Sequence, residues 1–479
     1  MDAPDILLLG RQSVKGVLAL ASRTFVLQLI SIVAFLLIST ILKPSDIGVY
    51  TAVIAIQRII NFFTDFGLGA ALIQKKQDLT QDDLSTSFTI QAGITLIIFI
   101  GILLLRDQIS SFFKLNPDGE RLLLALVFTV FVSSFKTIPS ILLERKIQFQ
   151  KLVIPQIAES LVFNIILVVL VLRGMGVDSY TYAFLVSSLI GLPIYYYISP
   201  WKVGLGINRE ALGNLKFGIA FQTKNVLATI KDDLLTVILV KFLSFTQIGY
   251  IGFAQRISFL AYRYVVDSVT KVTFSTYSRI QDNTQVLRHA IEKSLFFVSL
   301  LMFPILTGII LLSPYIVEFV PKWNKWEPAV ISILFFCLNA AVSSLSGILV
   351  NILDATGKVK KTLNLMVIWT LLTWVLTPIF IDRFGYNGVA AASFVVSMTI
   401  GYTVYLVKQI VEFDFIKSIY KPIISSVLMG GILFLYLDVY ASNLIIMSFA
   451  VIIGVFIYGL SMYILARSEI REGLKLIRK

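Results

Sequence analysis

The sequence predicts an all-α polytopic membrane protein with about 14 transmembrane helices, built as two six-helix bundles plus two extra C-terminal helices. Three observations support this fold class. Hydrophobic residues make up 57% of the 479 residues and charged residues only 14%, whereas soluble domains carry about 25% charged residues. The apolar residues form long runs, and a helix needs about 20 of them to cross a bilayer. The two halves of the chain also resemble each other, which indicates a parallel repeat.

Composition excludes several other classes of protein. A soluble domain could not cover its surface with so few charged residues, and a disordered chain would hold fewer apolar ones. A β-barrel would show alternating segments of about ten residues. The net charge of +13 is typical of cytoplasmic loops rich in Lys and Arg, so no nucleic acid partner is expected. The single Cys337, and the single His289 in a predicted loop, disfavour disulfides, metal sites and His-based catalysis.

The apolar runs follow one another with short connections. In chain order the predicted spans cover residues 16–42, 47–73, 87–105, 122–143, 153–172, 180–199, 217–241, 247–276, 294–313, 329–353, 362–381, 388–408, 422–437 and 444–466. The connections are too short to hold a separate folded domain. The chemistry of the protein is therefore expected within the bilayer or at its surfaces.

The distribution of Lys and Arg predicts the orientation. The termini and the even-numbered loops carry most of the basic loop residues, among them Lys75, Arg145 and Lys358. The positive-inside rule then places both termini in the cytoplasm of a multi-pass protein of the cell (plasma or inner) membrane. Tyr195–Tyr197 and the Trp323 region mark expected membrane interfaces.

An internal repeat divides the chain. A shift of 210 residues places 132–196 on 342–406, and a shift of 201 places Ile47-Gly48 on Ile248-Gly249. An even number of spans in each copy makes the two copies parallel, which suits alternating access. The predicted division is an N-lobe (1–210, spans 1–6), a C-lobe (211–415, spans 7–12), and spans 13–14 with a cytoplasmic tail (416–479).

Charged residues inside predicted spans are the candidate functional residues, because an intramembrane charge usually faces a cavity or a partner. The basic candidates outnumber nearby carboxylates and are predicted to bind an anionic substrate in a cationic cavity: Arg23, Arg58, Lys224, Arg256 and Arg263. The acidic candidates are predicted to couple an ion or to form salt bridges: Asp65, Asp232, Asp233 and Asp267.

Two of these predictions keep an alternative. Asp267 lies four residues from both Arg263 and Lys271, which favours a salt bridge on one helix face. The segment 231–233 fits either a coupling-ion site or a short kink. Two further intramembrane charges, Lys136 and Glu159, are interpreted as snorkelling side chains.

Two segments carry a family resemblance. Leu-Lys-Pro-Ser-Asp-Ile-Gly-Val-Tyr (42–50) and Asp-Phe-Gly-Leu-Gly-Ala-Ala-Leu-Ile-Gln (65–74) are similar to the start of Wzx-type lipid-linked oligosaccharide flippases of the multidrug/oligosaccharidyl-lipid/polysaccharide (MOP) exporter superfamily. The resemblance extends through the span count and the duplicated unit. It implies a MATE/MOP-like fold of two lobes that open alternately to each side of the membrane.

The resemblance also implies a substrate. It predicts translocation of polyprenyl-diphosphate-linked oligosaccharide from the cytoplasmic to the outer leaflet, for O-antigen, capsule or exopolysaccharide biosynthesis. The related lipid II flippase is similar in carrying arginines on its first, second and eighth helices, the spans that hold Arg23, Arg58 and Arg256 here. The expected partners are this lipid, the membrane lipids and a polysaccharide polymerase machinery. No cofactor is expected, and a sodium or proton gradient is the expected driver.

Two alternatives remain at the level of the sequence. A multidrug/cation antiporter of the same fold would favour surplus acid in its cavity, whereas this sequence holds surplus base. A membrane polysaccharide polymerase or ligase would favour a large external loop with catalytic polar residues, and the predicted external loops are short. The sequence therefore favours a transporter over an enzyme.

Overall fold

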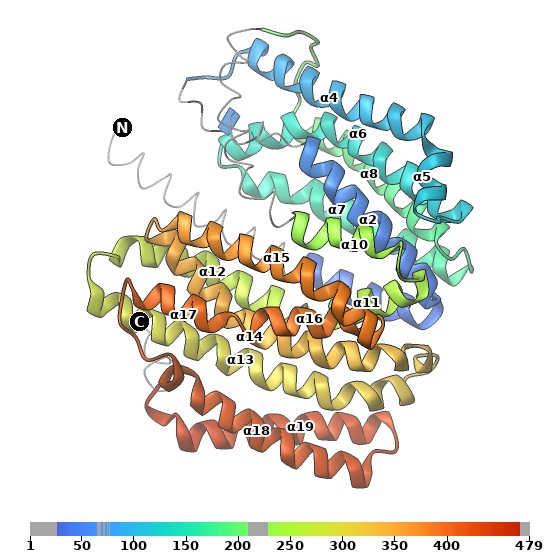
Figure 1. Cartoon of the computed structure of the whole chain (residues 1–479). Helices are drawn as coiled ribbons and strands as arrows, with labels where there is room; N and C mark the ends of the chain where they lie inside the picture. The colour runs from blue at the N-terminus through green and yellow to red at the C-terminus, as the bar shows by residue number, and fades with distance from the viewer. Residues whose placement is uncertain are drawn as a thin grey trace. The chain divides into compact units, whose positions relative to one another are not determined.

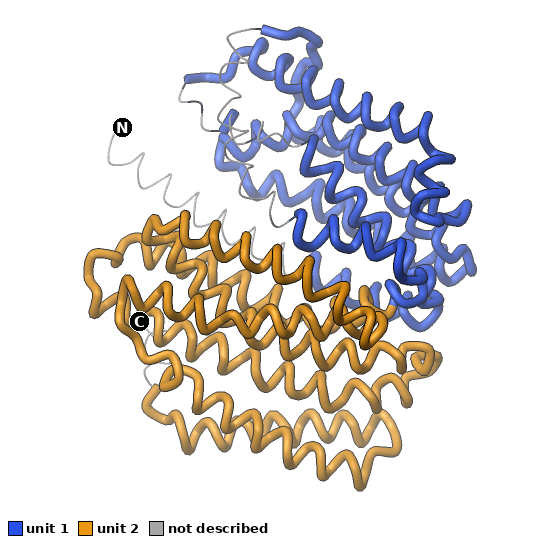
Figure 2. Tube along the Cα trace, in the orientation of Figure 1, with its two compact units in different colours: residues 1–249 blue, residues 250–479 orange. Residues whose placement is uncertain are grey.

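A computed structural model describes residues 26–64, 69, 72–73, 75, 77–208 and 229–469 of the chain. All regular elements in this part are helical. The chain forms two compact units, Met1–Gly249 and Tyr250–Lys479 (Figure 2). The predicted boundary between 210 and 211 lies outside the described residues, so the three-part division stays a prediction.

The first unit contains a helix over Val26–Ile41 and a series of labelled elements (Figure 1). These are α2 (Pro44–Thr64), α4 (Gln81–Leu104), α5 (Arg106–Phe112), α6 (Pro117–Arg145), α7 (Phe149–Leu172), α8 (Asp178–Ile198), the π-helical turn η1 (Ile230–Leu234), α10 (Leu235–Leu239) and the start of α11 (Phe245–Ser258). Helix α6 packs against α2, α4, α7 and α8. It is therefore the central helix of this unit.

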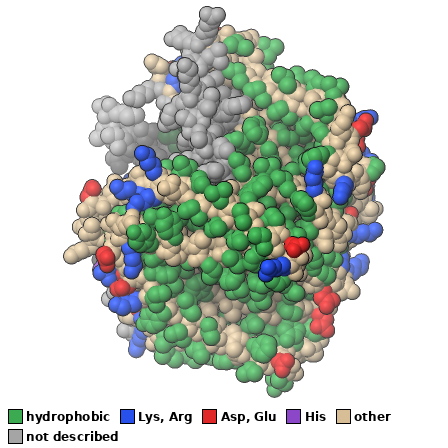
Figure 3. Space-filling view, in the orientation of Figure 1, with side chains coloured by type: hydrophobic (Ala, Val, Ile, Leu, Met, Phe, Trp, Pro, Cys, Tyr) green, Lys and Arg blue, Asp and Glu red, His purple; other side chains and the backbone are tan. Residues whose placement is uncertain are grey.

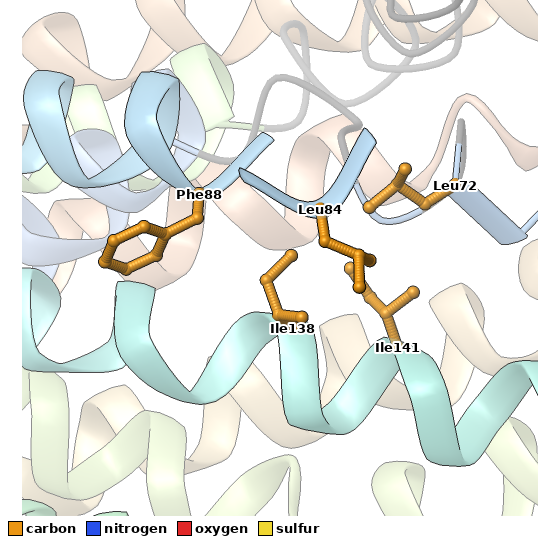
Figure 4. Packing of buried hydrophobic residues seen from close by; sticks show 5 residues of the cluster. All are labelled: Leu72, Leu84, Phe88, Ile138 and Ile141. Carbon is orange, nitrogen blue, oxygen red and sulfur yellow. The ribbon is translucent and has the colours of Figure 1, made fainter. Parts of the chain in front are cut away.

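Local sequence explains where α6 begins and how it is held. The Asn116 side chain accepts a hydrogen bond from the Gly119 amide, and Pro117 occupies the first turn, where its missing N–H costs nothing. Near the other end, Ile138 and Ile141 of α6 pack with Leu84 and Phe88 of α4 and with Leu72 (Figure 4). All five side chains are buried, so this cluster ties the two helices together.

The second unit contains the remainder of the chain. Its elements are the rest of α11, then α12 (Leu260–Ile280), α13 (Thr284–Phe319), the 3₁₀ turn η2 (Asn324–Ala329), α14 (Val330–Ala355), α15 (Val359–Phe384), α16 (Asn387–Ser397), α17 (Ile400–Lys408), α18 (Phe415–Tyr440) and α19 (Leu444–Leu465). Helix α14 packs against α12, α13, α15, α16 and α17. Helices α18 and α19 pack against each other and against α13.

Helix boundaries agree with the predicted repeat. Helix α6 ends at Arg145 and α14 at Ala355, while α7 begins at Phe149 and α15 at Val359, a spacing of 210 residues in both cases. Equivalent helices also pack together, since α6 contacts α4 and α8 as α14 contacts α13 and α16. The predicted fold class, an all-α membrane protein with two parallel repeats and two further C-terminal helices, is confirmed.

Eleven helices in the described residues are long and apolar enough to cross a membrane, and Val26–Ile41 is a shorter apolar helix. The eleven match predicted spans 2–6 and 9–14. The seventh predicted span lies partly outside the described residues, and the eighth corresponds to α11 and α12, which meet at Phe259. The total of 14 spans therefore stays a prediction. In Figure 3 hydrophobic side chains cover most of the visible face, and most charged side chains lie toward two opposite margins.

One prediction about the first half of α13 is wrong. His289 lies within α13, not in a loop. The Asn283 side chain accepts a hydrogen bond from the Val286 amide, and this cap allows the helix to begin at Thr284, ahead of the apolar run. Apolarity therefore located the membrane part of this 36-residue helix but not its polar start.

Candidate functional site

Two of the predicted candidates in the first unit contact each other. Arg58 lies on α2, which packs against η1. Its Nη1 atom donates to Oδ1 of Asp233 at 3.1 Å. The Arg58 side chain is 58% exposed and that of Asp233 only 15%. Arg58 therefore has a carboxylate partner and still presents more than half of its surface.

The segment that carries Asp233 has an unusual backbone. Residues Ile230–Leu234 form a single π-helical turn, and such turns interrupt the ordinary hydrogen-bond ladder and frequently occur at functional sites. On the same turn Nζ of Lys231 lies 3.1 Å from Oδ1 of Asp232. Asp233 lies on this turn and contacts α2 through Arg58, while the choice between a coupling-ion site and a kink stays open. Whether these carboxylates couple an ion stays a prediction.

The second unit holds the predicted candidates of α11 and α12. Arg256 lies in the last turn of α11 and is half-buried, whereas Arg263 and Asp267 are exposed on α12. Asp267 lies one helical turn from Arg263 and one from Lys271, so opposite charges alternate along one strip of the helix. This spacing is compatible with the salt bridging that the sequence left open.

Three further candidates cannot be placed. Arg23, Asp65 and Lys224 lie outside the described residues. Their assignment as substrate-binding or ion-coupling residues stays a prediction.

A cavity of about 410 Å³, lined by both polar and apolar side chains, lies within the first unit. Side chains of the Val26–Ile41 helix, α2, α6, α7 and α8 line it. Polar lining residues include Gln57, Asn61, Ser133, Gln156, Ser160 and Ser187. Cavities of this size are typical of small-molecule sites.

Lys136 and Glu159 form an ion pair in the wall of this cavity. Nζ of Lys136 on α6 donates to Oε1 of Glu159 on α7 at 2.6 Å and to the Ser188 hydroxyl on α8 at 3.1 Å. Lys136 is only 9% exposed. The interpretation of these two side chains as snorkelling is therefore wrong, because the ammonium group is directed to partners inside the unit.

Gly191 on helix α8 provides the space that the Glu159 side chain of this ion pair occupies. A Cβ atom on Gly191 would lie 1.6 Å from Oε1 of Glu159. Only glycine lets the carboxylate lie directly against the α8 backbone. The sequence contained a signal for this contact, since charges occupy the middle of two successive predicted spans, but residues 23 positions apart could not be paired without the fold.

Comparisons with known proteins agree with this architecture. Residues 37–331 match a family described as "Polysaccharide biosynthesis protein". The chain is 23% identical over 443 residues to "Lipopolysaccharide biosynthesis protein WzxC" of Escherichia coli (strain K12), covering 91% of this chain and 86% of that protein. It is 23% identical over 480 residues to "Uncharacterized membrane protein in cps region" of Klebsiella pneumoniae, covering 96% of each.

Solved structures show the same fold. The inward closed conformation of the lipid II flippase MurJ matches with a TM-score of 0.76 and 18% identity, covering 94% of this chain and 99% of that one. An inward-facing multidrug resistance transporter of the MATE family matches with a TM-score of 0.63 and 14% identity, covering 80% and 95%. The family match confirms the likeness to polysaccharide biosynthesis proteins that was predicted from the sequence, and the solved structures confirm the predicted MATE/MOP-like fold.

Proposed function

This chain belongs to the family of polysaccharide biosynthesis proteins, and we propose that it is a flippase that moves polyprenyl-diphosphate-linked oligosaccharide from the cytoplasmic to the outer leaflet by alternating access. The family match carries the proposal. It covers residues 37–331, which include the charged helices α2, α11 and α12. The likeness of the fold to a lipid flippase supports it.

The physical problem fits this fold. A diphosphate with sugars cannot cross hydrocarbon unaided, because burying charged and unpaired polar groups is costly. The polyprenyl tail can remain in the lipid throughout. A transporter therefore needs only cationic and hydrogen-bonding side chains on its spanning helices, such as Arg58 and Arg256, and makes or breaks no bond in its cargo.

Two alternatives fit less well. A multidrug resistance transporter of the MATE family shares the fold at a lower TM-score, 0.63 against 0.76 for the lipid flippase. A polysaccharide polymerase or ligase would require catalytic groups outside the bilayer. The long connection between α4 and α6 is instead largely taken up by the seven-residue helix α5.

The finer features of the proposal concern energy, position and partners. We propose coupling to a sodium or proton gradient, with Asp232, Asp233 and Asp267 as candidate coupling residues and with no cofactor. We also propose that the protein lies in the plasma or inner membrane with both termini in the cytoplasm. A polysaccharide polymerase machinery would then receive the flipped repeat unit at the outer surface.

The deciding experiment measures where lipid-linked sugars reside. Lipids are extracted from cells that lack the protein, and the leaflet of the diphosphate-linked sugars is determined with a membrane-impermeant sugar-modifying enzyme. We expect completed repeat units to accumulate on the cytoplasmic leaflet and re-expression to restore their export. An unchanged amount and leaflet distribution would exclude the flippase, and efflux of cationic dyes would then test the drug exporter.

A further inference from the structure

The cavity of the first unit has a lining suited to an uncharged, hydroxyl-rich ligand. Amide and hydroxyl side chains from four helices face it, including Gln57, Asn61 and Ser160. Its two lining charges, Lys136 and Glu159, cancel each other. A diphosphate would meet the Glu159 carboxylate and a drug cation the Lys136 ammonium, so the charge pattern favours neither.

Hydrogen-bonding capacity remains at the cavity wall. Lys136 carries three N–H donors, and Glu159 and Ser188 accept from two of them. The buried Oε1 atom of Gln156 has no hydrogen-bond partner among the described residues. A buried acceptor without a partner is costly, and rotation of the Gln156 amide into the cavity that it lines would let a ligand hydroxyl satisfy it.

Aromatic rings stand beside these polar groups. Phe163 of α7 and Phe184 of α8 both line the cavity, with ring centroids 4.6 Å apart. Sugar rings have C–H faces that pack on apolar surfaces and hydroxyl edges that need hydrogen bonds. The cavity offers both kinds of surface within about 410 Å³.

The second repeat shows that the scaffold does not require these charges. At the same shift of 210 residues, Lys136 corresponds to Ser346, Glu159 to Trp369 and Gln156 to Met366. Helices α14 and α15 nevertheless adopt the boundaries of α6 and α7. The Lys136–Glu159 pair is therefore present in only one copy of a shared framework, and an intramembrane charge pair is costly to keep without a role.

We infer that this cavity is a carbohydrate subsite that binds one sugar ring of the lipid-linked cargo, apart from the arginines that face the diphosphate. Gln156 and Glu159 accept hydrogen bonds from sugar hydroxyls, and Lys136 donates its remaining N–H. This inference rests on the proposed function, since it assigns the sugar part of the same substrate. It predicts that substitutions here discriminate between cargo with and without sugar.

The experiment compares two ligands on the full-length protein in lipid nanodiscs. The probes are the lipid-linked repeat unit that accumulates in cells lacking the protein, and bare polyprenyl diphosphate. Two variants are tested: Gln156→Met, and the double substitution Lys136→Met with Glu159→Gln, which removes both charges. We expect each to weaken binding of the sugar-bearing lipid about tenfold. This is the effect of losing roughly one hydrogen bond to a charged or buried group. Binding of bare polyprenyl diphosphate stays unchanged.

Thr137→Val is the matched control, because Thr137 follows Lys136 on α6 but does not line the cavity. Its binding of both lipids should equal that of the unmodified protein, and melting temperatures confirm that all variants fold. An equal loss for both lipids, or no loss for either, overturns the carbohydrate subsite. If the unmodified protein binds neither lipid, the proposed function itself fails.

Discussion

Gly48 and Gly249 allow α2 and the first residues of α11, which belong to the first unit, to approach until their backbones touch. A Cβ atom on Gly48 would lie 1.7 Å from the backbone oxygen of Phe245, and one on Gly249 would lie 1.8 Å from that of Pro44. The contact is reciprocal, because the repeat that pairs Gly48 with Gly249 also pairs Pro44 with Phe245. Small residues permit such close packing of helices in membranes.

Gly48→Ala is therefore expected to disrupt the crossing of α2 and α11. Backbone atoms cannot yield to the added methyl group, so the helices must separate or the protein must lose stability. We expect a lower melting temperature in detergent and reduced export in cells. Gly93→Ala on α4 is the control, because nothing lies within 4 Å of a Cβ placed there. A Gly48→Ala protein with normal melting and export would contradict the crossing.

Arg58 combines an ion pair with an exposed guanidinium, and the two functions can be separated. Arg58→Ala should lower export more than tenfold if the exposed part binds the diphosphate, and Arg58→Lys should retain part of it because Lys cannot bind bidentately. Asp233→Asn, which removes only the carboxylate charge beside Nη1 at 3.1 Å, should have the milder effect. Export is measured by the leaflet assay with each variant. Equal losses of export activity for Arg58→Ala and Asp233→Asn would show that the Arg58–Asp233 ion pair has a structural role only.

At the scale of an element, the start of α4 shows how a polar network positions an apolar helix. The Asp83 carboxylate accepts from Nζ of Lys75 at 2.7–2.8 Å and from the backbone amide of Thr80 at 2.9 Å. The Thr80 side chain accepts in turn from the Asp83 amide at 3.2 Å, which completes a capping box. Asp83 is 4% exposed. The network joins the segment before α4 to the helix that carries Leu84 and Phe88.

Asp83→Ala is expected to lower the free energy of unfolding by about 3 kcal/mol, because it leaves the Lys75 charge without its partner and removes the Asp83 side chain's half of the capping box. Asp82→Ala supplies the control, since Asp82 is exposed and, within the described part of the chain, its carboxylate accepts a hydrogen bond from Asn208 alone. Denaturant unfolding in detergent measures both. Equal losses of unfolding free energy for Asp83→Ala and Asp82→Ala would show that the buried network contributes no stability beyond that of an acidic residue in the first turn of α4.

The sequence predicted helices correctly where a long run of apolar residues defines them. Eleven predicted spans correspond to helices, and the repeat correctly aligned α6 with α14 and α7 with α15. The charged stretch over 230–280 was harder, because a π turn at Ile230–Leu234 and an irregular residue at Phe259 leave no trace in apolar periodicity. Likewise, Arg58–Asp233 and Lys136–Glu159 join different helices, and one sequence without the fold does not pair them.

For the whole molecule, one buried cysteine makes the predicted orientation directly testable. Cys337 is fully buried and its thiol donates to the Ser258 hydroxyl, so it should resist aqueous thiol reagents. A cysteine introduced at exposed Ser111 should react with a membrane-impermeant maleimide in intact cells, and one at exposed Asp282 only after permeabilisation. The unsubstituted protein is the control. The reverse pattern would place both termini on the outer side.

The two repeats share the same helices but carry different side chains at equivalent positions. Position 159 holds a carboxylate against Gly191, whereas its counterpart Trp369 donates to the Thr399 hydroxyl at 2.8 Å. Since each copy carries its own residues, a substitution at one position leaves its counterpart in the other copy unchanged. Duplication thus allows corresponding positions to hold different side chains on the same helical framework. Selection for a new cargo can in this way act on the lining of a single copy without changing the helices of either.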